Sequence, residues 1–370
     1  MRMFYKYPGW CMSAMGDIYQ DVKRSTWRSY PDGEEKEKGM PLIRKDVITM
    51  FTACELGVFD LLHEAQEPIP AATIASRLGT SVDGMERMLD ACVGLKLLKF
   101  DLKNNEGYYS NTDVSTMYLV KSSPRTLYHM MMYYSNTIYM CWHFIPQAVR
   151  EGKSQYERAF GISSKEVFEA VYRSEEEMLT FMHHMDSIWN ICGKDVIHAF
   201  DLSVFHTVYD LGGCSGGLAK QFVSTYKDST VTIMDLPKVV QTAKKHFVTD
   251  KEQQIHFFEG DFFNDPIPEA DLFILARIIH DWTEEKCIAL LRKIYQSCRS
   301  GGGVLIVEAL LNEDKSGPVI SQLFSLNMLV QTEGKERTPS EYTKLLTDSG
   351  FRDIEVKATG KIYDAILGRK

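Results

Sequence analysis

A glycine-rich turn between an apolar run and a helical pattern constrains the fold of this chain more than any other feature. Residues 208 to 217 read VYDLGGCSGG, and apolar residues at helical spacing resume at Leu218. This order indicates a buried strand, a tight turn and a helix, and the glycines let a ligand approach main-chain atoms. The G-x-G-x-x-G fingerprint is matched only loosely, so an ordinary glycine turn is an alternative.

A second apolar segment adds an acidic residue at a suitable distance. Residues 230 to 235 read TVTIMD and end in Asp235. In nucleotide-binding sheets, a carboxylate about 20 residues beyond the glycine turn accepts the hydrogen bonds of a ribose diol. Together, the two segments favour a nucleoside-binding site.

Strands and helices alternate from Val204 to the C-terminus. This order predicts an α/β fold, a Rossmann-like mostly parallel sheet with helices on both faces, closed by late strands at 354–356 and 362–367. Ligands of such sheets bind beyond the carboxyl ends of the strands. The run Gly301–Gly303 precedes a strand rather than a helix, so we expect a turn there and no phosphate site.

The first half of the chain has the order of a winged helix-turn-helix. Apolar spacing predicts a long amphipathic helix over 41–61, helices at 71–78 and 82–95, and a hairpin over 97–110. A DNA-binding regulator is therefore one hypothesis.

The charge of this region argues against nucleic acid as a partner. The helix at 82–95 carries Asp83, Glu86 and Asp90 against Arg87, and the chain has a net charge of -8. A recognition helix needs basic side chains that face phosphates. We therefore favour a helical module that packs against a partner subunit, which predicts a homodimer.

With 370 residues the chain is long for one core, and two domains are expected. We predict a poorly ordered N-terminal appendage at 1–40, a winged-helix-like dimerisation domain at 41–125, a helical linker contributing to a substrate pocket at 126–203, and the α/β domain at 204–370. A methionine and aromatic stripe at 130–145 is typical of core packing, although it also suits a flat aromatic ligand.

Cysteine usage and hydropathy predict the compartment. The eight cysteines are scattered without a CxxC pair, so neither a zinc site nor a disulfide framework is expected. Reduced thiols suit a cytoplasmic protein. The N-terminus lacks a signal-peptide pattern and no run of about 18 apolar residues occurs, so we expect no membrane span.

His280 follows the predicted strand at 272–276 and is the candidate catalytic residue. Asp281 comes next, and Glu308 ends the neighbouring strand. A carboxylate on one imidazole nitrogen fixes the tautomer and leaves the other nitrogen free to take a proton, as a general base does. No carboxylate cluster with metal spacing is expected at this rim, so we predict no metal.

Two other pairs of residues could bind a ligand or could serve only the structure of the protein. Asp261 could accept from an amino group beside a purine stacked on Phe262, or these residues could cap a turn and fill the core. Asn327 and Gln331 lie four residues apart on one face of an apolar helix. They could hold a substrate amide, although solvent exposure or helix packing explains them nearly as well.

Several motifs in order resemble a known family. They are DLGG at 210–213, DLP at 235–237, GDFF at 260–263, HDW at 280–282 and GKERT at 334–338. The chain resembles the S-adenosylmethionine-dependent, metal-independent O-methyltransferases of small molecules from about Phe51 to its C-terminus. Closer motifs at 53–62, 172–175 and 325–334 imply O-methylation of the 5-hydroxyl of an indole substrate, N-acetylserotonin.

The resemblance also implies roles for individual residues. His280 would be the general base, oriented by Glu308 and Glu336, and the substrate would contact Asp281, Asn327 and Gln331. The methyl donor, S-adenosylmethionine, would contact Tyr172, Trp189, Asp210, Gly212, Asp235, Gly260, Asp261, Phe262 and Arg277.

The chain departs from the family pattern in two places. Cys214 stands where the family usually has a third glycine, so donor affinity should fall if this position requires a positive φ. Residues 1–45 do not resemble the family's N-terminal helix, which reaches the partner subunit. Alternatives to the main reading are a methyltransferase for another hydroxyindole or phenol, and a catalytically inactive methyltransferase-like protein.

Overall fold

The computed structural model describes residues 43–161, 168, 171–249 and 252–370. The chain divides into two compact units, residues 1–138 and 139–370, and each is described by itself. The appendage predicted at 1–40 lies outside the described residues. No helix in the described ranges is both long and apolar enough to cross a membrane.

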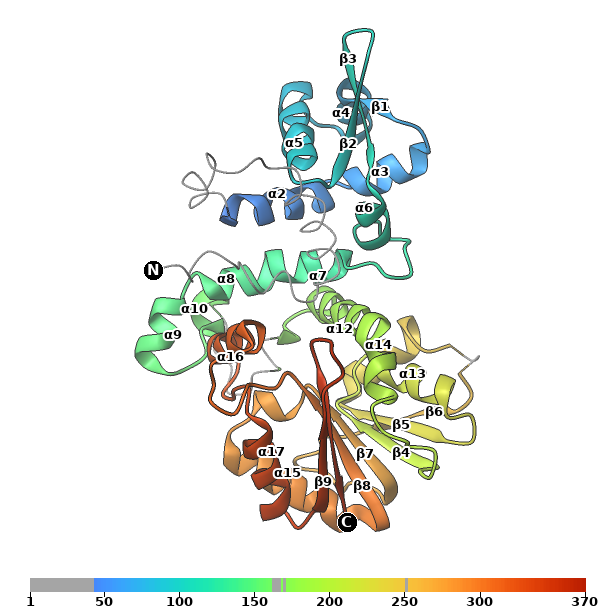
Figure 1. Cartoon of the computed structure of the whole chain (residues 1–370), viewed down its shortest axis with the longest axis vertical. Helices are drawn as coiled ribbons and strands as arrows, with labels where there is room; N and C mark the ends of the chain where they lie inside the picture. Colours follow the sequence, from blue (N-terminus) through green and yellow to red (C-terminus); the bar gives the residue numbers. More distant parts are fainter. Residues whose placement is uncertain (1–42, 162–167, 169–170, 250–251) are drawn as a thin grey trace. The chain divides into compact units, whose positions relative to one another are not determined.

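The first unit consists of helices and a small antiparallel sheet, whose strands β1, β2 and β3 have the order β1-β3-β2 (Figure 1). The predicted long helix is wrong in one respect, because Gly57 with a φ of 80° separates two helices. Ser81 accepts from the Gly84 N–H and caps the helix that follows the tight turn. The predicted order of helix, turn, helix and hairpin is confirmed. The elements are α2 (Ile43–Glu55), α3 (Val58–Ala65), β1 (Ile69–Pro70), α4 (Ala71–Leu78), α5 (Val82–Gly94), β2 (Leu98–Lys103), β3 (Glu106–Asn111), α6 (Asp113–Tyr118), α7 (Tyr128–Tyr133) and the π-helix η1 (Tyr134–Ile138).

The second unit begins with helices that precede its sheet. Ser174 accepts from the Glu177 N–H and caps the longest of them, so within the predicted helical stretch 163–200 this helix starts only at Glu175. Residues 162–167 and 169–170 of that stretch lie outside the described part. The helices are α8 (Tyr139–Trp142), α9 (Ile145–Glu151), α10 (Tyr156–Phe160) and α12 (Glu175–Ile197).

A seven-stranded sheet of order β6-β5-β4-β7-β8-β10-β9 forms the core of the second unit. The pairs from β6 through β8 are parallel, and β10 is antiparallel to both β8 and β9, so the predicted mostly parallel sheet is confirmed. The strands are β4 (Thr207–Leu211), β5 (Thr230–Asp235), β6 (Ile255–Glu259), β7 (Ala270–Ala276), β8 (Cys298–Glu308), β9 (Arg352–Lys357) and β10 (Asp364–Arg369).

The turn predicted at Gly301–Gly303 is wrong. These glycines lie within β8, at an irregularity where the pairing with β7 moves from Ala270↔Cys298 to Leu272↔Gly303. A Cβ on Gly302 would lie 2.4 Å from the Asp271 carbonyl oxygen, so this close approach between strands requires glycine.

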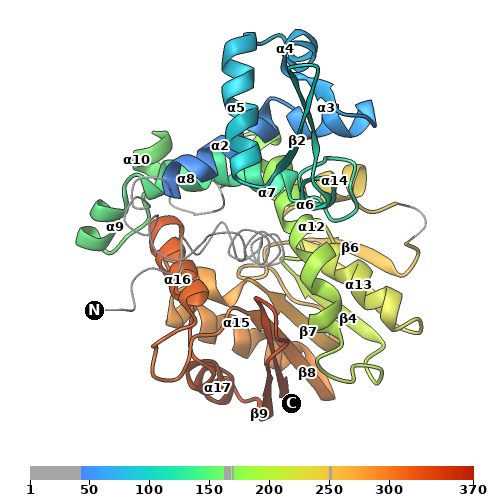
Figure 2. The same ribbon diagram turned by 45° about the horizontal axis from the view of Figure 1, so that its top comes forward.

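Helices cover both faces of the sheet because the buried strands are apolar on both sides. Leu272 and Ile274 of β7 pack with the helices of one face, and Phe273 with Leu275 pack with those of the other. Figure 1 and Figure 2 show α15 and α17 on one face and α13 with α14 on the other. These helices and the one that follows β8 are α13 (Gly217–Thr225), α14 (Pro237–His246), α15 (Glu284–Ser297), α16 (Val319–Gln331) and α17 (Pro339–Asp348).

The carboxyl ends of the parallel strands carry the candidate residues. Asp210 is the second-last residue of β4, and Asp235 and Glu308 are the last of β5 and β8. The short 3-10 helix η2 (Ile279–Asp281) follows β7 and contains His280. The topology therefore brings these side chains to one edge of the sheet.

Candidate active site

The turn after β4 adopts backbone conformations that side chains seldom permit. Gly212 has a φ of 70°, and Cys214 has a φ of 52° although it carries a Cβ. A left-handed conformation costs a residue other than glycine roughly 1–2 kcal/mol. Cys214 therefore has the positive φ for which we expected weaker binding of the methyl donor.

Asp235 is anchored to this turn by main-chain groups. Its Oδ2 accepts from the Cys214 N–H at 2.9 Å and its Oδ1 accepts from the Leu236 N–H at 2.8 Å. A carboxylate oxygen can accept two hydrogen bonds, so each keeps capacity for a ligand hydroxyl. The geometry is therefore compatible with a ribose diol.

Burial makes the acids at this turn reluctant to ionise. Burial raises the pKa of Asp210 to about 7, with Asp235 adding to the shift, and it raises the pKa of Asp235 to about 6. The Oδ2 atom of Asp210 is buried and has no hydrogen-bond partner among the described residues. A cationic ligand would stabilise both carboxylates in their charged form.

Asp261 supports the structural alternative that the sequence left open. Its Oδ1 accepts from the Phe263 N–H at 2.8 Å and its Oδ2 accepts from the Asn264 amide at 2.6 Å, so the carboxylate closes a turn. Phe262 is partly buried and packs against the core on the α15 side. A Cβ on Gly260 would lie 3.0 Å from Met234 Cε, which leaves little room beside β5.

Three further residues of the expected donor site lie in the second unit: Trp189 on α12, Tyr172 before α12, and Arg277 after β7. A Cβ on Gly217 would lie 3.1 Å from the Trp189 Cβ, so α12 passes close to the glycine turn. The Tyr172 ring packs 5.9 Å from that of Phe181. Arg277 has a φ of 60°, and its side chain lies 2.9 Å from the Met185 sulfur.

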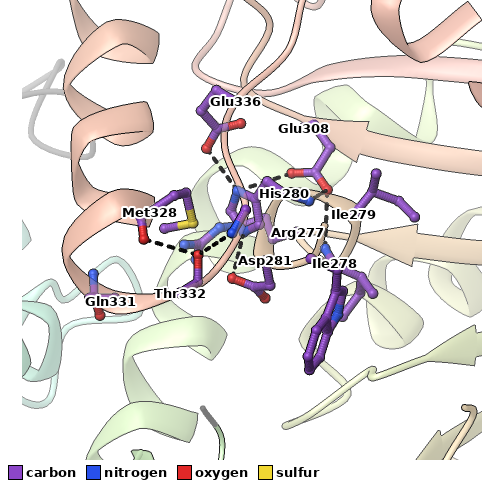
Figure 3. Close-up of polar contacts among 12 residues, drawn as sticks. Arg277, Ile278, Ile279, His280, Asp281, Glu308, Met328, Gln331, Thr332 and Glu336 are labelled. Atoms are coloured by element: carbon purple, nitrogen blue, oxygen red, sulfur yellow. Dashed lines mark hydrogen bonds and ion pairs between the residues drawn. The ribbon is translucent and has the colours of Figure 1, made fainter. Parts of the chain in front are cut away.

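His280 lies among carboxylates from three segments of the chain (Figure 3). Its side chain is 4% exposed, so solvent screens these contacts weakly. Nδ1 lies 2.7 Å from Glu336 Oε1 and 3.3 Å from Glu308 Oε2. Nε2 lies 3.6 Å from Asp281 Oδ1 and has no hydrogen bond in the described ranges. The carboxylates therefore hold a proton on Nδ1 and leave Nε2 able to take one.

Burial and charge oppose each other at this ring. Burial lowers the pKa of His280, but Glu308, Glu336 and Asp281 raise it by more, to about 9. Burial raises the pKa of Glu308 to about 7, an effect that His280 partly offsets. The protons of these groups are coupled, since each charge state depends on the others.

Glu308 also fixes the backbone that carries the histidine. Its Oε1 accepts from the Ile278 N–H at 3.1 Å and from the His280 N–H at 3.2 Å. The same carboxyl group therefore sets both the position and the charge of the imidazole.

Two residues of this arrangement carried no assigned role at the sequence level. Buried Arg337 donates to the carbonyl oxygens of Ile279 and Trp282, both at 3.0 Å, and clamps the turn around His280. A Cβ on Gly334 would lie 2.1 Å from the His280 carbonyl oxygen, so only glycine lets the segment with Glu336 pass. Both lie in the motif GKERT, and this motif is the sequence feature that could have identified them.

The predicted absence of a carboxylate cluster with metal spacing is wrong. Among the described residues, ligand atoms of His280, Glu308 and Glu336 lie within 4.8 Å of one another. Glu308 Oε1 accepts from main-chain N–H groups and Glu336 Oε1 from the imidazole, whereas Oε2 of each glutamate is buried without a hydrogen-bond partner among the described residues.

Asn327 and Gln331 lie near the C-terminal end of α16, and both are buried. Their spacing of four residues places them on one face, and the solvent-exposed alternative for them is wrong.

Comparisons with known proteins find matches for both units of the chain. Residues 142–352 match a family model described as an O-methyltransferase domain, and residues 46–121 match an O-methyltransferase dimerisation domain. Acetylserotonin O-methyltransferase of Gallus gallus is 63% identical over 87% of this chain and 93% of its own length, and that of Homo sapiens is 52% identical over the same shares. A crystal structure of human N-acetylserotonin methyltransferase in complex with SAM is similar with a TM-score of 0.88 and 49% identity, covering 91% of this chain and 99% of that one.

Replacing Gly212 by alanine should disrupt the edge of the sheet that carries these residues. The new Cβ would lie 2.5 Å from Ile278 Cδ1, next to the turn of His280. Gly301→Ala is the matched control, because Gly301 has a φ of 79° but nothing within 4 Å of a Cβ. Ile278 Cδ1 is the end of a flexible side chain that can move aside, so urea denaturation should show a loss of about 1–3 kcal/mol for Gly212→Ala and about 1 kcal/mol for the control. Equal losses would mean that φ alone matters.

The free energy of unfolding should fall between about pH 7 and pH 10. A histidine whose pKa is raised to about 9 in the folded state contributes stability that is complete below about 6.5 and is lost as pH rises through the folded value. Glu336→Gln removes the negative charge beside Nδ1, which helps to raise the pKa of His280, and should flatten this decline. Glu333→Gln, which loses an ion pair with Lys286 instead, should keep it. Urea midpoints over this range measure the slopes, and parallel slopes in all three proteins would contradict the assignment.

Proposed function

The chain belongs to the O-methyltransferase family, and on this premise we propose that it methylates the 5-hydroxyl of N-acetylserotonin with S-adenosylmethionine, which yields melatonin. The proposal is carried by the buried His280 imidazole, with Nδ1 2.7 Å from Glu336 and Nε2 without a hydrogen bond in the described part of the chain. The identity of the substrate is inferred from the relatives, which are named acetylserotonin O-methyltransferase.

The residues at the glycine turn fit S-adenosylmethionine. Asp235 has capacity for a ribose diol, and Asp210 supplies a buried carboxyl oxygen without a partner among the described residues, which suits a cationic ligand. The bound donor would supply an electrophilic methyl carbon. The residues proposed to hold it are Tyr172, Trp189, Asp210, Gly212, Asp235, Gly260, Asp261, Phe262 and Arg277.

His280 serves as the general base. Glu336 accepts the hydrogen bond of Nδ1–H, which fixes the tautomer in which Nε2 can take the hydroxyl proton. Because the carboxylates raise the pKa of His280 to about 9, the ring is mostly protonated at neutral pH, and it acts as a base in the fraction that has lost the Nε2 proton. Glu308 and Glu336 stabilise the imidazolium that forms when this fraction takes the hydroxyl proton. A neutral phenol is a poor nucleophile, so proton removal and alignment both accelerate the reaction. Asp281, Asn327 and Gln331 contact the substrate.

The remaining assignments extend this proposal to the whole chain. The match of residues 46–121 to a dimerisation domain supports a homodimer built through the predicted domain at 41–125. The linker at 126–203 and the methyltransferase domain at 204–370 complete the proposed division. The free cysteines of the described residues suit the cytoplasm, where thiols stay reduced.

Replacing His280 by alanine should abolish most of the turnover. General base catalysis contributes roughly 10²–10⁴-fold, so kcat should fall by that factor with methyl-labelled S-adenosylmethionine and N-acetylserotonin. Donor affinity measured by calorimetry should stay unchanged, because the donor lies at the glycine turn. His256→Ala, on an exposed position of β6, is the control. Turnover near that of the control would exclude His280 as the base.

Excess chelator should leave the activity undiminished. The cluster of His280, Glu308 and Glu336 has metal spacing, but the proposed chemistry needs its atoms to share protons. Activity is measured with and without chelator and after addition of Mg²⁺ or Zn²⁺. A loss that a divalent metal restores would show that this cluster is a metal site instead.

A further inference from the structure

The face of α16 that carries Asn327 and Gln331 is held by residues from the preceding helices. α16 packs against α8 and α9, and Val330 of α16 belongs to one buried cluster with Cys141, Ala148 and Tyr156. The Gln155 N–H donates to the Val330 carbonyl oxygen at 2.8 Å, and the Ser154 hydroxyl donates to the Gln331 carbonyl oxygen at 3.0 Å. The two amide side chains therefore project from a firmly supported backbone.

Trp142 of α8 determines which way the Asn327 amide points. Its indole Nε1–H donates to Asn327 Oδ1 at 2.8 Å. An indole N–H can only donate, so the atom that faces it must be the amide oxygen. The NH₂ group of Asn327 is thereby directed away from Trp142, and no described residue accepts a hydrogen bond from it.

Tyr156 of α10 contacts Gln331 in a similar way, but a phenolic hydroxyl can donate or accept, so this contact orients the amide less strictly than the indole orients Asn327. The Tyr156 hydroxyl donates to Gln331 Oε1 at 3.2 Å. The Gln331 NH₂ group has no acceptor in the ranges that the structure describes. Both residues are 7% exposed, and neither amide nitrogen is among the fully buried atoms that lack a partner, so each NH₂ group keeps accessible surface for an acceptor on a ligand.

We propose that Trp142 and Tyr156 are specificity-determining positioning residues, which lock the amides of Asn327 and Gln331 with their NH₂ groups available to the substrate. The face then recognises a side chain that offers a hydrogen-bond acceptor, such as the carbonyl oxygen of an acetamide. It rejects an ammonium group, which brings only donors to a surface of donors. This inference rests on the proposed function, because it concerns the side chain of the hydroxyindole substrate.

The test compares three 5-hydroxyindoles that share the ring: one with an acetamidoethyl side chain, one with an aminoethyl side chain, and one with none. Methyl transfer is followed with labelled S-adenosylmethionine. The wild-type protein should prefer the acetamide to the amine by at least about 100-fold in kcat/KM, since buried donors left unpaired discriminate strongly.

Removal of either lock should affect the acetamide alone. Trp142→Phe and Tyr156→Phe should each raise KM for the acetamide by about 10-fold, the loss expected for one oriented hydrogen bond, while kcat and the constants for the ring without a side chain stay within about 2-fold. Tyr226→Phe is the control, because this hydroxyl bonds to the Phe200 carbonyl oxygen instead. If Trp142→Phe does not fold, Tyr156→Phe carries the test.

Asn327→Asp should invert the preference. Trp142 would donate to one carboxylate oxygen, and the other oxygen would replace the NH₂ group by an acceptor. The ratio of kcat/KM for the amine over the acetamide should rise by at least about 100-fold.

Two outcomes overturn the inference. If the two phenylalanine variants match Tyr226→Phe, or if Asn327→Asp weakens both substrates equally, the lock does not exist even though methyl transfer continues. If the wild-type protein labels none of the three hydroxyindoles, the proposed function itself fails, and the inference fails with it.

Discussion

The second unit depends on keeping one imidazole and its carboxylates together where water is nearly excluded. Isolated charges in such a place are costly, and a pair broken by removal of one member is costlier still. Here Glu308 accepts from two main-chain N–H groups as well as facing the ring, and Glu336 accepts from the ring at 2.7 Å. The cluster joins the ends of β7 and β8 to the segment before α17. Among the described residues, Glu308 Oε2 and Glu336 Oε2 already lack a hydrogen-bond partner, and a shift of any one of these elements would add further unpaired groups.

Strained backbone surrounds this cluster on the side of the glycine turn. Gly212, Cys214 and Arg277 all have positive φ, and two of them carry side chains that disfavour it. Such conformations persist only where the surroundings fix them. Asp235 fixes Cys214 through its N–H, and the Val307 carbonyl oxygen fixes the N–H of Arg277. In these three residues the strain lies at loops of the carboxyl edge, where a ligand needs close access to the main chain.

The sequence predicted what depends on local pattern and on topology. Alternating apolar segments determine the parallel sheet, and the rule that ligands bind at its carboxyl edge is enough to bring Asp210, Asp235, His280 and Glu308 into one region. The clamp by Arg337 and the need for Gly334 could not be predicted in this way, because both depend on contacts with a turn more than fifty residues earlier in the chain. The same limit explains the metal-like spacing of His280, Glu308 and Glu336, whose atoms meet only after three separate segments have packed.

The two halves of the proposed site differ in the charge that they accept. The edge formed by β4 and β5 is acidic and buried, and a cation would stabilise it. The face of α16 is uncharged, and its amide oxygens already accept from Trp142 and Tyr156, which leaves the NH₂ groups as donors. A substrate with a free ammonium group would be attracted to the acidic half, where we propose that the methyl donor binds, and opposed at the amide half. An acylated amine carries no charge, so the acidic half does not attract it. Its carbonyl oxygen is the acceptor that the NH₂ groups of Asn327 and Gln331 need. Charge and hydrogen-bond polarity therefore separate the two ligands, which a site lined by one kind of group could not do.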